Sequence, residues 1–285
     1  MDVLVPVLKS HPGKSVLVFA LIFKLIHRLL QRLPVPKVVK QDDFKSWKWK
    51  NLSVSIVHSL LTGSWALTCS DSLWQPGEEW HVQTGRGTGE RHTTVHVLVW
   101  PEMLRNLHSY HTPLSYLLVC VSTGYFVHDA SDIILTGHGR QSWEFLLHHV
   151  LVISCFLYAL FTKMYVAGAV VALFVEVNSV TLHMRLMLKL ACAQSSSVYH
   201  VNKLINITTY LTFRLGTQSY LTWYIVTNYT WLDHALYFLI AMVMMNVMIL
   251  IYFYRLLCAD FFPWSKRSGR PNGPNNNHSK KFPCD

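Results

Sequence analysis

The sequence predicts an all-α fold, a polytopic transmembrane helical bundle of about seven spans, with six as the alternative. Of its 285 residues, 51% are hydrophobic and only 14% are charged, whereas a soluble domain carries about a quarter charged residues. Apolar runs of about 20 residues, long enough to cross a bilayer, recur along the chain. The net charge of +10 comes from basic residues that flank these runs, which indicates membrane topology and argues against nucleic acid as a partner.

The first predicted span is the weakest of the seven. Lys24, His27 and Arg28 interrupt it, and its short apolar part is similar to the core of a signal peptide. Pro34 and Pro36 follow in place of a small-residue cleavage site, so we expect a retained helix that ends before them. In chain order the predicted spans are 16–30, 52–70, 114–135, 143–161, 165–190, 201–226 and 234–257.

Basic residues predict how these spans are oriented. The segment after the first span carries Arg28, Arg32, Lys37, Lys40, Lys45, Lys48 and Lys50. Short basic flanks stay in the cytoplasm, so the N-terminus is predicted outside and the C-terminus in the cytoplasm. The last residues contain no dilysine retrieval signal, which favours the plasma membrane, with the endoplasmic reticulum as the alternative.

Composition divides the chain into three regions. Residues 1–40 hold the weak first span and a basic juxtamembrane segment, 41–260 form the main membrane domain, and 261–285 are predicted to be a disordered cytoplasmic tail. Within the membrane domain, the polar and glycine-rich stretch 75–100 is interpreted as an inserted outside loop.

Ionisable side chains inside the apolar spans are the candidate functional residues. Each costs about 2.5–3.5 kcal/mol at a helix centre unless it is paired or faces water. Helical spacing puts Asp129 with Asp132, and Glu144 with His148, on shared faces. Arg185 and Arg214 are available to neutralise two of the carboxylates, so we expect one polar cavity. Its predicted lipid or acyl-binding residues are His128, Asp129, Asp132, Glu144, His183, Arg185 and Arg214.

The adjacent His148 and His149, with Glu176, are the candidate catalytic residues. One imidazole can act as a base or a transient acyl acceptor, Glu144 or Glu176 can orient it, and Arg214 can hold a phosphate or a developing oxyanion. The alternative is a buried network of ion pairs and hydrogen bonds that only fixes helix packing.

Metal chemistry is not predicted in spite of 16 histidines. The chain has no repeated H-x-x-H-H boxes and no zincin motif, so we expect neither a metal nor a cofactor. His58 and Asn246, for which the sequence shows no local charged partner, are expected to serve helix packing.

Several short motifs, each weak alone, occur together between residues 47 and 260. They are WKWKNL at 47–52 with HS at 58–59, GYFVHD at 124–129, WE at 143–144, HHV at 148–150, VEV at 175–177, YHVNK at 199–203 and FRL at 213–215. As a set they resemble the TLC domain family, which includes translocating-chain proteins, the Lag1 ceramide synthases and a ceroid-lipofuscinosis protein. The resemblance implies a TLC-type helical bundle that acts on membrane lipids.

The resemblance also implies a function. It implies that this protein, like family members that share these motifs, regulates the phospholipid acyl composition and fluidity of the plasma membrane by limiting the incorporation of polyunsaturated chains. Ceramide synthases begin their site with a His-His pair that matches His148 and His149, but their later carboxylates fall here on Val175, Glu176 and Ser179. A ceramide-synthase-like acyltransferase is therefore the lesser alternative.

The residues leave open whether the chain is an enzyme, and they favour a non-enzymatic role. As an enzyme it would be a lipid acyltransferase, with acyl-CoA as a substrate. The main alternative is a non-enzymatic membrane partner that modulates another integral protein, such as a calcium channel. Membrane lipids are the expected partners in the first case and an integral membrane protein in the second.

Overall fold

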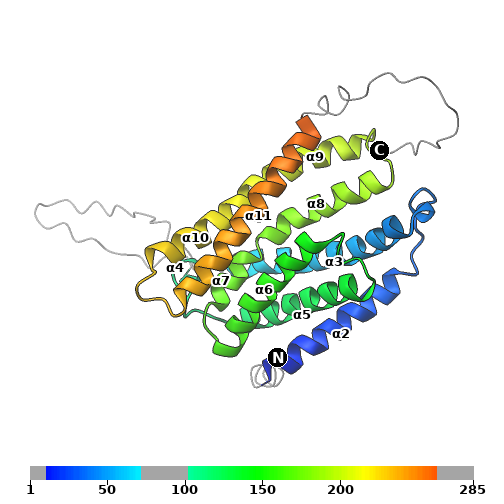
Figure 1. The fold of residues 1–285 in the computed structure, drawn as a ribbon. Coiled ribbons are helices and arrows are strands. Elements are labelled where there is room, and N and C mark those ends of the chain that lie inside the picture. Colours follow the sequence, from blue (N-terminus) through cyan, green and yellow to red (C-terminus); the bar gives the residue numbers. More distant parts are fainter. Residues whose placement is uncertain (1–10, 72–101, 262–285) are drawn as a thin grey trace, which may run out of the picture.

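A computed structural model describes residues 11–71 and 102–261. The predicted inserted loop 75–100 lies outside the described residues, and so does the predicted tail 261–285 except for its first residue, Phe261. The described chain is helical and contains no strand, and its long helices lie side by side in one bundle (Figure 1). The helices and short turns are α2 (Pro12–Leu30), η1 (Val39–Gln41), α3 (Asp43–Asp71), α4 (Glu102–Arg105), α5 (Pro113–Leu135), α6 (Trp143–Thr162), α7 (Val166–Ala172), α8 (Val175–Leu190), α9 (Ser197–Thr209), η2 (Tyr210–Gly216), α10 (Thr217–Thr227) and α11 (Ala235–Phe261).

Within residues 11–71 and 102–261, five helical segments are long and apolar enough to cross a membrane. They are Asp43–Cys69, Pro113–Leu135, Trp143–Thr162, Val166–Leu190 and Ala235–Asp260. Each coincides with a predicted span, and the all-α, multi-span class is confirmed. The exact number of spans stays a prediction, because α2 and the rod formed by α9, η2 and α10 do not meet the same criteria.

Local sequence explains both exceptions. Lys14, Lys24 and Arg28 put three charges into the 19 residues of α2. The rod formed by α9, η2 and α10 is interrupted by η2, a π-helix of seven residues. Neither α9 nor α10 alone is therefore long enough to cross a membrane. A rod that continues through a π-helical segment can nevertheless have the length of a span, since π segments are widened turns within longer helices.

Capping residues define where the helices begin and end. Thr112 accepts a hydrogen bond from the Ser115 amide (3.1 Å) and Ser115 accepts one from the Thr112 amide (2.8 Å), forming a capping box before Pro113. Ser196 caps α9 through the Tyr199 amide (3.2 Å). These polar starts separate the apolar segments where the hydropathy predicts breaks.

The long helices of the described chain close into a ring. Going around it, α3 packs on α5, α5 on α6, α6 on α11, α11 on α10 and η2, η2 and α9 on α8, and α8 back on α3. Helix α2 packs outside this ring, mainly against α5 (Figure 1). The short α7 contacts α5, α6 and α10 and is almost completely buried, so it fills the interior at one end.

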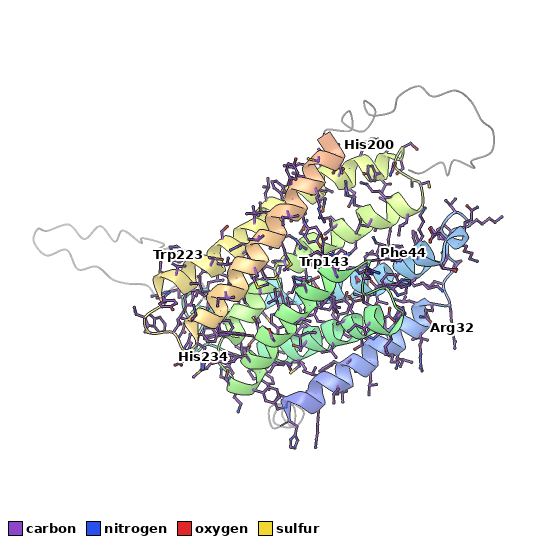
Figure 2. The ribbon with its side chains drawn as sticks, in the orientation of Figure 1. Arg32, Phe44, Trp143, His200, Trp223 and His234 are labelled. Carbon is purple, nitrogen blue, oxygen red and sulfur yellow. The ribbon has the colours of Figure 1, made fainter. Side chains whose placement is uncertain are left out.

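The two ends of the bundle differ in composition. Arg32, Phe44 and His200 lie toward one end, whereas Trp223 and His234 lie at the other (Figure 2). Because the basic segment 28–50 is at the first end, we call it the basic end. The interior near this end is hollow.

Candidate functional site

A cavity of about 320 Å³ lies inside the ring and reaches the basic end, where Trp47, Lys48 and Arg255 border it. Helices α3, α5, α6, α8, η2 and α11 all contribute to its wall. Seven of the ten predicted site residues line it. They are Asp129, His148, His149, Glu176, His183, Arg185 and Arg214.

His149 and Asp129 form a dyad between α6 and α5. His149 Nε2 lies 3.2 Å from Asp129 Oδ2, and both side chains are buried. Asn51 on α3 donates from Nδ2 to the other carboxylate oxygen of Asp129 at 2.5 Å. A carboxylate held in this way fixes the tautomer and the orientation of the imidazole. The orienting carboxylate is thus Asp129, where the sequence predicts Glu144 or Glu176.

His148 also lines the cavity, but it is not held by a partner. It forms no hydrogen bond to any residue that the structure describes, and its ring touches only those of Phe126 and His149 (centroids 6.4 and 5.5 Å away). The adjacent histidines therefore differ: His149 is fixed by a carboxylate, and the His148 ring nitrogens are available to a molecule in the cavity.

Glu176 is the second residue of α8 and follows a break in the helix. At this break the amides of Phe174, Glu176 and Val177 bond three residues back instead of four, as in a 3₁₀ turn. The turn directs Glu176 toward α3, where its carboxylate accepts from Ser59 Oγ at 2.5 Å and lies 3.7 Å from His58 Nδ1.

His58 packs within this cluster as the sequence predicts, but it is not isolated. Its ring is fully buried and stacks on Tyr125, with centroids 3.8 Å apart. The Tyr125 hydroxyl donates to Ser55 Oγ at 2.8 Å. Asn246, the other residue expected to serve packing, donates to Thr222 Oγ1 at 2.9 Å and joins α11 to α10.

Arg214 enters the cavity from the π-helical segment η2. Its Nε donates to Asn178 Oδ1 at 2.9 Å and its Nη2 to Ser179 Oγ at 2.8 Å, both on α8. The guanidinium also lies 5.5 Å from the centroid of the Tyr210 ring. Arg214 was expected to neutralise a carboxylate, but its hydrogen-bond partners are neutral.

Arg185 and His183 complete the α8 side of the cavity. Arg185 Nη2 bonds to Asp260 Oδ1 near the end of α11. This pair is buried, and Asp260 is not among the carboxylates that the sequence analysis assigned to the cavity. His183 lines the cavity, and its Nδ1 is buried without a hydrogen-bond partner.

Glu144 does not pair with His148, although helical spacing puts both on one face of α6. Its carboxylate accepts from Arg255 Nη1 (2.7 and 2.9 Å) and from the Tyr252 hydroxyl (3.0 Å). Both partners are on α11, so Glu144 ties α6 to α11 beside the cavity mouth. Shared-face spacing could not predict this pairing because a distant helix supplies the cation.

Asp132 and His128 lie outside the cavity, between α5 and α2. Asp132 accepts from Trp47 Nε1 at 2.9 Å and lies 3.7 Å from His27 Nδ1. The rings of His27 and His128 meet edge to face, with centroids 5.4 Å apart. These two predicted cavity residues therefore help to attach the weak first helix to the ring.

Sequence reasoning missed several partners of the predicted residues. All of them are on helices distant in sequence from the group that they contact. They are Trp47, Asn51, Ser59, Tyr252 and Asp260. Trp47 and Asn51 belong to the first motif of the family resemblance, which is the only signal in the sequence that points to them.

Metal ligation finds no support in the described ranges, where no group of three or more His, Cys, Asp or Glu side chains could hold an ion. The arrangement instead provides a histidine open to the cavity, a histidine oriented by a carboxylate, and an arginine, all beside apolar walls. Such a site can bind a lipid group and exchange a proton with it.

These features define a class: a multi-span helical membrane protein with a polar cavity inside its ring of helices. The family model described as the TLC domain matches residues 48–258. The chain therefore belongs to the TLC domain family.

Known relatives resemble the chain over most of its length. TLC domain-containing protein 1 of Homo sapiens is 37% identical over 273 residues, 95% of this chain and 97% of the relative. TLC domain-containing protein 1 of Rattus norvegicus is 39% identical over 254 residues, 89% and 92% of the two chains. TLC domain-containing protein 2 of Danio rerio is 36% identical over 246 residues, 86% and 88%. No solved structure matches the chain.

Proposed function

We propose that this protein regulates the acyl composition of membrane phospholipids by engaging a lipid or an acyl thioester in the interior cavity. In this role it limits the incorporation of polyunsaturated chains and so sets the fluidity of the plasma membrane. The observation that carries the proposal is the cavity itself: His148 faces it unpaired beside the His149–Asp129 dyad, and the walls toward α11 are apolar. An intramembrane polar cluster of this kind marks a substrate pathway by default.

The cavity is suited to a lipid because of where it lies. It reaches the basic end of the bundle, and Trp47 and Lys48 at its border are residue types that settle at a membrane interface. Met245, Met248 and Ile249 provide an adaptable apolar wall along which an acyl chain can lie.

If acyl transfer occurs, the geometry favours distinct roles for the two histidines. His149, oriented by Asp129 at 3.2 Å, is placed to act as the base. His148, which has no hydrogen bond to the described residues, is placed to contact the reacting group.

Orientation and compartment form part of the proposal. With the basic end in the cytoplasm, as short basic flanks require, the N-terminus is outside. The cavity then opens toward the cytoplasmic leaflet. The plasma membrane is proposed from the family resemblance.

The proposal is tested by profiling phospholipid acyl chains in cells that lack the protein. Cells are rescued at equal surface levels with wild type, with His148→Ala/His149→Ala, or with the control His200→Ala. His200 is an exposed histidine of α9 that does not line the cavity. We expect wild type and the control to restore the profile and the double variant to fail. Equal rescue by all three would remove the histidines from the function and direct the search to protein partners.

A further inference from the structure

Arg214 differs from the other two arginines of the cavity in how its charge is balanced. Arg185 is paired with Asp260, and Arg255 with Glu144. Between residues 11 and 71 and between 102 and 261, no carboxylate forms an ion pair with Arg214. A charge inside a membrane protein is costly unless it is paired, so an unpaired guanidinium in a cavity needs a reason.

The two hydrogen bonds of Arg214 fix its position. Nε and Nη2 are both held by α8, through Asn178 and Ser179 at 2.9 and 2.8 Å. Nη1 has no partner in the part of the chain that the structure describes, and Arg214 lines the cavity. A planar guanidinium anchored along one edge presents its other donors in a fixed direction, which suits an oxyanion.

The surrounding charges limit which anion fits. Asp129 and Glu176 line the same cavity, and Asp129 is occupied by His149 and Asn51. Glu176 accepts from Ser59 and interacts electrostatically with Arg214 without forming an ion pair or a hydrogen bond with it, so its carboxylate leaves the guanidinium donors open. These carboxylates repel an anion with several charges more strongly than a monoanion. The cavity volume of about 320 Å³ is at the lower end of the range of about 300–1,000 Å³ for ligand cavities. It therefore suits one chain end better than a two-chain phospholipid.

We infer that the cavity binds the monoanionic end of a single-chain lipid, with Arg214 as the counter-ion and the apolar wall of α11 along the chain. This inference rests on the proposed function and names the class of lipid that the site accepts. The shared chemistry is one oxyanion on one hydrocarbon chain, which a fatty-acid carboxylate or the phosphodiester of a lysophospholipid supplies.

The test measures lipid binding to the full-length protein in nanodiscs by native mass spectrometry. The probes share one chain: oleate carries a carboxylate, 1-oleoyl-lysophosphatidylglycerol a singly charged phosphodiester, and oleyl alcohol no charge. Variants are Arg214→Gln, Arg214→Lys and the control Arg28→Gln, which makes the same change at an exposed position of α2. Thermal unfolding of each variant reports whether it is folded.

Wild type is expected to bind one or both anionic probes about tenfold or more tightly than oleyl alcohol, since a charge-assisted hydrogen bond has that effect. Arg214→Gln should lose this preference and Arg28→Gln should keep it, whereas Arg214→Lys, which retains the charge without the planar fork, should keep only part of it. The stronger of the two anionic probes identifies the source of the oxyanion.

Equal binding of all three probes to wild type would overturn the inference, and so would an unchanged preference in folded Arg214→Gln. If Arg214→Gln does not fold, the inference is still tested by the affinities of wild type for the three probes and by the affinities of Arg214→Lys for the same probes. The outcome is separable from that of the rescue experiment, because binding can fail while the acyl profile still depends on the histidines, and the reverse also holds.

Discussion

At the residue scale, the interior is built from short polar relays that each join two or three helices. Asn51, Asp129 and His149 connect α3, α5 and α6, and Ser59 and Glu176 connect α3 to α8. Removing one member of a relay leaves a buried polar group unpaired, which costs more than the hydrogen bond itself contributes.

Asn51→Leu tests the first relay. Removing the amide leaves Asp129, which is 5% exposed, with one partner fewer, so we expect a loss of about 1–3 kcal/mol in the free energy of unfolding. Thermal unfolding in detergent measures it. Ser53→Ala is the matched control, since the Ser53 hydroxyl bonds only to the Trp49 carbonyl of its own helix (2.9 Å). A variant as stable as the control would contradict the relay.

Two ion pairs join α11 to its neighbours and can be compared. Arg185 of α8 pairs with Asp260 of α11, and Arg255 of α11 pairs with Glu144 of α6. Arg185→Leu leaves Asp260 buried and unpaired, which should destabilise the protein by about 3–5 kcal/mol. Arg255→Leu removes a pair in which the arginine is exposed, so its effect should be much smaller. Unfolding temperatures of the two variants give the order, and a larger shift for Arg255→Leu would show the burial argument to be wrong.

The sequence could not predict which site residues form hydrogen bonds or ion pairs with each other across different helices. Helical spacing shows which side chains share a face, as for Glu144 and His148, but not which other helix that face meets. Tyr252 and Arg255 reach Glu144 only because α11 closes the ring beside α6. The ionisable residues themselves were predictable, because charge inside an apolar span is conspicuous.

At the element scale, α2 depends on close packing more than on hydropathy. A methyl group built on Gly124 of α5 would lie 2.5 Å from Phe19 Cβ and 2.9 Å from the Ala20 backbone nitrogen. The missing side chain of Gly124 lets the two backbones approach, as small residues do between membrane helices. The His27–Asp132 contact adds a polar tie near the basic end.

Gly124→Ala should therefore destabilise the protein by about 1–3 kcal/mol through overpacking, and loosen α2. Gly168→Ala on α7 is the control, because its nearest atoms would lie at 3.8 Å, an ordinary contact distance. Protease sensitivity of the α2–α3 connection and thermal unfolding both report the difference. Equal stability of the two variants would mean that α2 does not pack as described.

The membrane-spanning helices were predicted more completely than the side-chain contacts between them. Each of the five helices that qualify as spans overlaps a predicted one, since burial in a bilayer requires long apolar runs. The π segment η2 and the turn before Glu176 were not predicted, because a single glycine, Gly216, at the end of η2 does not distinguish a π segment from an ordinary helix and no Pro or Gly lies at the turn. Both place site residues, Arg214 and Glu176, so the missed irregularities are the functionally informative ones.

At the scale of the whole molecule, the ring is filled at one end by α7 and hollow at the basic end. A ligand of the proposed kind would enter from the side where Lys48 and Arg255 border the cavity. If the basic end is cytoplasmic, the site samples lipids of the inner leaflet.

Cysteine labelling tests this orientation. In a background without native cysteines, Trp231→Cys in the exposed α10–α11 loop should react with an impermeant maleimide on intact cells. His200→Cys, at the basic end (Figure 2), should react only after permeabilisation. The reverse pattern would invert the orientation, and protection of both residues in intact cells would place the protein in an internal membrane.

The central claim is that the open interior, and not the outer surface, determines phospholipid acyl composition. Filling the cavity tests it most directly, using Met248→Trp on the cavity wall and Val247→Trp, whose side chain is 51% exposed on the outer face of the same helix. Both are expressed at equal surface levels in cells that lack the protein, and phospholipid acyl chains are profiled. We predict that Val247→Trp restores the wild-type profile and Met248→Trp does not, whereas full rescue by Met248→Trp would contradict the account.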